Sequence, residues 1–132
     1  MIPHYKNIHN RFKINDFHFD KEALYQLAYT LIKEGKDYEN DLGVFLLDWL
    51  DDKETIQLTT SGTTGAPKVI TIKKQSMVYS AIATGNFFNL HPQDKALLCL
   101  PARYIAGKMM IVRAMMLGLE LDIMAPSSHL DD

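Results

Sequence analysis

Cysteine is almost absent from this sequence, and it contains no long apolar run. The single cysteine, Cys99, has no partner for an internal disulfide and no neighbour at zinc-ligand spacing. Its position in the apolar run 96–100 predicts a buried core thiol in a reducing compartment. No run is long enough for a bilayer-spanning helix, and the first residues lack the apolar core of a signal peptide. We therefore expect a cytoplasmic protein with no membrane partner.

An excess of one charge is also missing. The 14 Lys and Arg residues nearly balance the 16 Asp and Glu residues, which gives a formal net charge of −2. No basic stripe is interleaved with aromatic residues, so the sequence predicts no nucleic-acid partner. The histidines show neither close helical pairing nor cysteine partners, and we expect no metal ligands from protein side chains. These histidines are His4, His9, His18, His91 and His129.

The 132 residues, of which 47% are hydrophobic, are about enough for one domain with a real core. Near alternation of aromatic and aliphatic residues predicts a strand over 11–19, kinked at Asn15 and Asp16. Apolar residues at three- and four-residue spacing then predict a helix that Asp20 caps and Gly35 ends. The same spacing predicts a second amphipathic helix from about Asn40 to residue 50.

The remaining pattern predicts an α/β fold. Residues 55–60 and 68–72 are typical of two β-strands, and a third helix is expected over about 76–88. Strand 96–100, helix 107–117 and strand 119–124 follow in the order of a right-handed βαβ unit with parallel strands. The methionines of that helix are expected to pack in the core. They are Met109, Met110, Met115 and Met116.

Serine, threonine and glycine are concentrated in residues 59–65, between the two central strands. Such a loop offers several converging hydrogen-bond donors to a phosphate chain, and Lys68 adds a positive charge at its exit. A Walker loop does not fit, because Gly62 and Gly65 are three residues apart and a strand follows instead of a helix. The Gly-x-Gly-x-x-Gly dinucleotide motif does not occur. A plain hairpin turn remains the alternative from composition alone.

The full segment from Leu58 to Ile70 resembles the phosphate-loop signature of the adenylate-forming superfamily, which contains acyl-CoA synthetases, luciferases and nonribosomal peptide adenylation domains. The resemblance implies the N-terminal part of the adenylate-forming enzyme fold. It also implies ATP, Mg²⁺ and CoA as cofactors and co-substrates. In that family the loop holds the β- and γ-phosphates of ATP while a carboxylate attacks the α-phosphate. The positions that inherit this role are Thr60, Ser61, Gly62, Thr63, Thr64, Gly65 and Lys68.

A second segment, Leu100 to Gly107, resembles the family's later Leu-Pro segment, which carries an aromatic residue or histidine at the acyl pocket. Tyr104 falls at that position, and Arg103, Gly107 and Lys108 are the other candidate substrate-binding residues. Many relatives have Phe-His where this chain has Arg103 and Tyr104, and a histidine-containing turn where it has residues 73–75. The N-terminal region and residues 124–128 are most similar to o-succinylbenzoate–CoA ligases of menaquinone biosynthesis. Arg103 or Lys108 would then pair with a second substrate carboxylate, or both are solvated charges at a helix entrance.

The resemblance implies a partial N-terminal adenylation subdomain over 1–132. Its three parts are an N-terminal strand with two helices (1–53), the phosphate-loop hairpin (54–73) and an αβαβ region (74–132). The family's adenine-binding segment, ribose-binding Asp, hinge and catalytic Lys are not found in the sequence. We therefore expect no complete catalytic set and an inactive fragment whose partner is the C-terminal portion of a ligase. The alternative is a non-catalytic nucleotide-binding or protein-interaction module. Uncovered apolar surface predicts that the fragment dimerises or aggregates.

Overall fold

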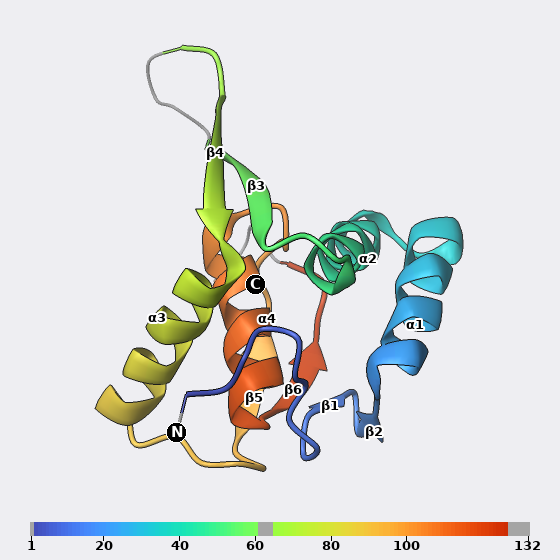
Figure 1. The fold of residues 1–132 in the computed structure, drawn as a ribbon. Coiled ribbons are helices and arrows are strands. Elements are labelled where there is room, and N and C mark those ends of the chain that lie inside the picture. The colour runs from blue at the N-terminus through green and yellow to red at the C-terminus, as the bar shows by residue number, and fades with distance from the viewer. Residues whose placement is uncertain (1, 61–64, 127–132) are drawn as a thin grey trace, which may run out of the picture.

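The computed structural model describes residues 2–60 and 65–126 and shows a mixed α/β fold (Figure 1). A four-stranded sheet has the order β2-β1-β6-β5, and a separate two-stranded sheet consists of β3 and β4. The β3–β4 hairpin projects away from the rest of the protein (Figure 1). The elements are β1 (Lys13–Ile14), β2 (Phe17–His18), α1 (Lys21–Glu34), α2 (Asp37–Leu50), β3 (Thr55–Thr60), β4 (Lys68–Lys73), α3 (Lys74–Phe87), β5 (Lys95–Leu98), α4 (Ile105–Leu117) and β6 (Glu120–Ile123).

The single kinked strand expected over 11–19 is wrong. Asn15 and Asp16 have φ angles of 48° and 71°, in the left-handed region. Two such residues in succession form the tight turn of a hairpin, so β1 and β2 fold back on each other as antiparallel strands. The polar pair that we interpreted as a kink therefore reverses the chain.

Helices α1 and α2 follow each other in the chain and pack against each other (Figure 1). Asp20 caps α1 as expected, because its carboxylate accepts from the backbone N–H of Ala23 at 2.8 Å. Helix α2 begins at Asp37, earlier than expected, because the Glu39 side chain accepts from the backbone N–H of Lys36. Asn40 instead bonds back to α1, donating to the Leu31 carbonyl at 2.6 Å.

The predicted βαβ unit is confirmed in its order and strand direction. Strands β5 and β6 are parallel and α4 connects them, while β1 is parallel to β6 on the other side. Met115 and Met116 on α4 are buried, and Met109 and Met110 pack against the core, as expected. The burial predicted for Cys99 is wrong: β5 ends at Leu98, and the thiol is exposed just beyond it.

Strands β3 and β4 form a regular antiparallel hairpin, and β4 runs directly into α3. The ladder extends from the pair Thr55 and Lys73 to the pair Thr60 and Lys68. No residue separates Lys73 at the end of β4 from Lys74 at the start of α3. The sequence pattern placed the start of α3 at about residue 76, but the helix starts at Lys74. The end of the hairpin formed by Thr55 and Lys73, its root, is thus joined directly to α3.

Candidate functional site

The Ser/Thr/Gly-rich segment lies at the end of the β3–β4 hairpin. Threonine and β-branched residues favour strands on both sides of it, which explains why the sequence forms a hairpin here. The backbones of Thr60 and Lys68 pair across the ladder where the loop begins and ends. Ser61, Gly62, Thr63 and Thr64 lie outside the described residues, and Gly65 is exposed with open space around it. The ladder thus ends at Thr60 and Lys68, and Gly65 beyond it is exposed.

The second predicted segment forms the entrance of α4. Tyr104 occupies the N-cap position, and its backbone N–H donates to the Pro101 carbonyl at 3.1 Å. Gly107 follows in the first turn of the helix, where an added Cβ would lie 2.4 Å from the Pro101 oxygen. The glycine therefore lets the Leu-Pro loop pack directly on α4. Its role in this structure is close packing, and it does not line the pocket beside it.

A pocket of about 330 Å³ lies between the hairpin and the start of α4. One wall is apolar and comes from the hairpin, and the other carries two cations and an aromatic ring. The fold thus places the two segments, more than thirty residues apart in the sequence, on one cavity. The lining residues are Leu58, Thr59, Ile70, Ile72, Arg103, Tyr104, Ile105 and Lys108.

Arg103 reaches this pocket with a carboxylate already near it. Its guanidinium lies 3.6 Å from Asp41 Oδ2 and 5.1 Å from the centre of the Tyr104 ring. A hydrogen bond with Tyr104, and next its charge interaction with that residue, raise the pKa of Arg103. Asp41 Oδ2 is buried without a hydrogen-bond partner among the described residues. The pair is therefore an ion pair that lacks close hydrogen-bond geometry.

Lys108 is half-buried, so it is not the freely solvated charge that one of our two interpretations allowed. Its ammonium group donates to the Ala102 carbonyl and lies 5.7 Å from the centre of the Phe45 ring. Burial lowers the pKa of Lys108, against the opposing effect of Asp41 and Asp48. A cation held partly out of water in this way interacts more strongly with a bound anion than an exposed one does.

Two polar residues of this region were missed by the sequence analysis. Asp41, on α2, faces Arg103 from a distant part of the sequence, and no local pattern marks it. Lys74 lies in the 73–75 segment where the chain departs from the histidine-containing turn of many relatives. That departure from the family pattern could have drawn attention to Lys74. In the structure, Lys74 is the one fully buried charged residue among those described.

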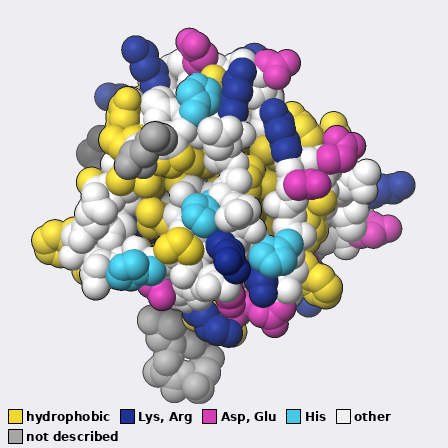
Figure 2. Space-filling view, turned by 60° about the horizontal axis from the view of Figure 1, so that its bottom comes forward, with side chains coloured by type: hydrophobic (Ala, Val, Ile, Leu, Met, Phe, Trp, Pro, Cys, Tyr) yellow, Lys and Arg dark blue, Asp and Glu magenta, His cyan; other side chains and the backbone are white. Residues whose placement is uncertain are grey.

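Charged side chains and histidines are spread over the face that Figure 2 shows. Lysine, arginine and carboxylate side chains are interspersed on the face in Figure 2, and the histidines visible there lie apart from one another. Among residues 2–60 and 65–126, no group of three or more His, Cys, Asp or Glu side chains is arranged to hold a metal ion. His129 lies outside these ranges. Within the described helices, none has the length and apolar character needed to cross a membrane.

This α/β arrangement, with its projecting hairpin and parallel βαβ unit, is the N-terminal part of the adenylate-forming enzyme fold. The chain belongs to the AMP-binding enzyme family, because the sequence model of that family matches residues 31–132. No curated protein matches the sequence. The assignment therefore rests on the family match and on solved structures.

Three solved structures illustrate the similarity. An acyl-CoA synthetase (AMP-forming)/AMP-acid ligase II-like protein from Dyadobacter fermentans is 38% identical with a TM-score of 0.66, over 78% of this chain and 29% of that chain. The o-succinylbenzoate CoA synthetase from Bacillus subtilis, in complex with its acyl-adenylate intermediate, is 27% identical with a TM-score of 0.51. That match covers 57% of this chain and 20% of that chain. The N-terminal domain of FACL13 from Mycobacterium tuberculosis is 24% identical with a TM-score of 0.52, over 63% and 24%, and shows the fold alone. The chain thus spans less than a third of these relatives.

Proposed function

We propose that this chain is the N-terminal part of an ATP-dependent carboxylate–CoA ligase, with residues 1–132 as one partial adenylation subdomain. The observation that carries the proposal is the shared pocket, which the phosphate-loop hairpin and the Arg103–Lys108 segment line together. In this reaction a substrate carboxylate attacks the α-phosphate of ATP and releases pyrophosphate. The acyl-adenylate then reacts with the CoA thiol to form a thioester and AMP.

The hairpin is suited to the phosphate end of ATP. Residues 60–65 supply hydroxyl groups and backbone N–H groups, and glycine allows close approach of the backbone. Lys68 adds a positive charge where the loop rejoins β4. Mg²⁺ would bind through the phosphate oxygens, with no ligand required from an acidic cluster, and would neutralise charge that develops on pyrophosphate. The role of this chain's residues is to hold and orient the leaving group.

The pocket is suited to the acyl substrate. Leu58, Ile70 and Ile72 provide an apolar wall, and Tyr104 adds an aromatic surface at the entrance of α4. Arg103 and Lys108 place positive charge on the opposite wall, where a second carboxylate would bind. An aromatic dicarboxylate such as o-succinylbenzoate meets both requirements. The similarity to the o-succinylbenzoate CoA synthetase from Bacillus subtilis supports this choice.

Phosphate contacts alone are expected to bind ATP weakly. Each charge-assisted hydrogen bond contributes about 1.5–3 kcal/mol, while association costs about 4–15 kcal/mol. A few such bonds leave an affinity near the millimolar range or weaker. The 132 residues by themselves should therefore bind ATP poorly and release no pyrophosphate, whereas a complete ligase that contains them should do so.

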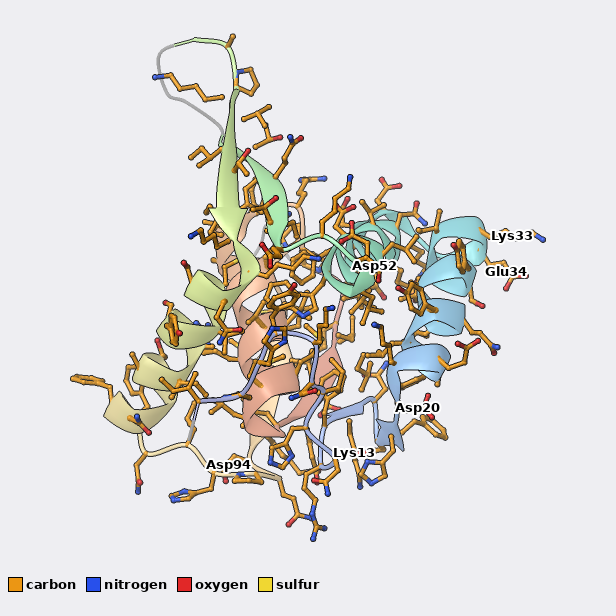
Figure 3. All side chains as sticks on the ribbon, viewed as in Figure 1. Lys13, Asp20, Lys33, Glu34, Asp52 and Asp94 are labelled. Atoms are coloured by element: carbon orange, nitrogen blue, oxygen red, sulfur yellow. The ribbon has the colours of Figure 1, made fainter. Side chains whose placement is uncertain are left out.

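The test is ATP-dependent pyrophosphate release by the complete ligase with o-succinylbenzoate and CoA. Lys68→Ala should lower kcat/KM for ATP by about 10- to 100-fold, corresponding to the loss of one charge-assisted bond. Lys33→Ala is the matched control, because Lys33 lies near the end of α1 on the side away from the hairpin (Figure 3). An intact ligase that is inert with every carboxylate tried would contradict the proposal and favour the non-catalytic module.

A further inference from the structure

Lys74, the first residue of α3, is fully buried and makes an ion pair that ties α3 to the end of α2. Its ammonium group lies 2.7 Å from Asp51 Oδ1 and 3.4 Å from the Asp51 carbonyl oxygen. It also lies 5.7 Å from the centre of the Tyr5 ring. Burying a charge is costly unless it is paired and hydrogen-bonded, so this site needs a reason beyond core packing.

The location of the pair supplies that reason. Lys74 follows β4 without a connecting residue, and its backbone N–H donates to the Glu54 carbonyl at 2.9 Å, immediately before β3. The same residue therefore closes the root of the hairpin with its backbone and anchors that root to α2 with its side chain. Asp51 is held in turn, because its carboxylate also accepts from the backbone N–H of Lys53 at 2.9 Å.

The adjacent residue, Gln75, secures the root from a second side. Its side chain accepts from the backbone N–H of Tyr5 at 2.9 Å and donates to the Pro3 carbonyl at 2.8 Å. The Tyr5 carbonyl accepts from the indole N–H of Trp49 on α2 at 3.2 Å. The N-terminal segment, the end of α2 and the start of α3 thus form one hydrogen-bonded junction beneath the hairpin.

The hairpin extends from this junction, so a small rotation at the junction becomes a larger displacement at the far end of the hairpin. Six residues of β4 extend about 20 Å, so a rotation of ~10° at the root would move the far end by about 3 Å. Ile56 and Leu58 of β3 are buried in the core and Ile72 of β4 packs against it, so the half of the hairpin next to the root is also held by core packing. The far half is exposed at Thr59 and at residues 68–70, so its direction follows from how the root half is held.

We propose that Lys74 is a positioning residue: its buried ion pair with Asp51 fixes the direction in which the β3–β4 hairpin leaves the fold. The consequence for ATP rests on the proposed function, but the positioning of the hairpin does not. The pair is asymmetric, since Asp51 keeps 40% of its side chain exposed and can be solvated alone, whereas Lys74 cannot. Lys74→Met is therefore the milder disruption.

The direct test is a pulsed electron-spin distance measurement on the 132-residue chain. Spin labels are attached through Ala66→Cys beyond the loop and Lys33→Cys on α1, in a Cys99→Ser background. Lys74→Met should broaden or shift the distance distribution by about 3 Å or more. Lys73→Met, which removes the neighbouring exposed lysine, should leave it unchanged. An unchanged distribution in folded Lys74→Met protein overturns the proposal.

Lys74→Gln keeps the test decisive if Lys74→Met does not fold. The Gln amide removes the charge but keeps a hydrogen-bond donor for Asp51, so a smaller broadening is expected, and none would overturn the proposal. In the complete ligase, Lys74→Met should raise KM for ATP at least about tenfold while KM for the carboxylate changes little. If Lys74→Met changes the distance but the wild-type ligase is itself inert, the positioning role of Lys74 is supported and the proposed function is rejected.

Discussion

At the scale of single residues, a carboxylate bound in the pocket would compete with Asp41 for Arg103. The guanidinium is largely exposed, and its 3.6 Å separation from Asp41 Oδ2 is too long for a hydrogen bond. A carboxylate at hydrogen-bond distance in the pocket would therefore bind Arg103, and loss of the long Asp41 pair would cost little free energy. Lys108 differs, because burial lowers its pKa and its ammonium group is already bonded to the Ala102 carbonyl.

This difference predicts that Arg103 contributes to selection between substrates. In the complete ligase, Arg103→Gln should raise KM for an aromatic dicarboxylate by about two- to fivefold, since exposed ion pairs are weak. KM for the matching monocarboxylate should stay within experimental error. Steady-state kinetics with both substrates measure the ratio, and Arg11→Gln serves as a control at an exposed, distant arginine. Equal effects on both substrates would show that Arg103 does not read the second carboxylate.

Features of single residues were predictable where they depend only on neighbouring residues in the sequence. Tyr104, Arg103 and Lys108 were predicted together because they follow the Leu-Pro segment in order, and the structure places all three beside one pocket. Asp41 and the buried state of Lys74 were missed because each depends on a partner brought in by the tertiary fold. Cys99 was misjudged for a related reason: the apolar run continues past Leu98, but the strand ends there.

At the scale of elements, each of the four described helices was expected, and apolar spacing predicted α1 and α2, each of which packs an apolar face in the core. The errors were at the ends, where local bonds decide. The bond between Lys36 and Glu39 starts α2 early, and the direct passage from β4 starts α3 early. The turn at Asn15 and Asp16 required two left-handed residues in succession, which alternation of side chains does not reveal.

The contact between the Leu-Pro loop and α4 gives a prediction at this scale. Gly107→Ala would place a methyl group 2.4 Å from the Pro101 oxygen and 3.2 Å from the Ala102 Cα. The backbone must move to relieve this overlap, so we expect a loss of about 1–3 kcal/mol in the free energy of unfolding. Chemical denaturation of the 132-residue chain measures the loss.

The neighbouring substitution Ala106→Ser provides the control. Ala106 is exposed on the same helical turn, so its change should alter the free energy of unfolding by no more than about 0.5 kcal/mol. If Gly107→Ala and Ala106→Ser behave alike, the loop and helix are not in the close contact described above. The role of Gly107 would then have to be sought in ligand binding.

At the scale of the whole molecule, one side of the four-stranded sheet ends in an uncovered edge. β5 pairs with β6 on one side, and on the other it has no strand partner within the described ranges. Leu97 on this strand and Phe88 at the end of α3 are 47% and 64% exposed. Both line a groove of about 680 Å³, together with Arg113, whose pKa is lowered by burial. An apolar groove beside an unpaired edge is a typical site of association.

We therefore expect the 132-residue chain to self-associate through β5 and the groove beside it. Sedimentation at increasing concentration should show a shift from monomer toward dimer or larger species. Leu97→Lys puts a charge into the middle of this surface and should weaken association at least tenfold, which corresponds to about 1.4 kcal/mol. Val44→Lys, at an equally exposed apolar position on α2, should leave association unchanged. A wild-type chain that stays monomeric at high concentration would mean that the exposed edge is too short and twisted to pair. Equal weakening by both variants would place the interface elsewhere, because only Leu97 lies on the sheet edge.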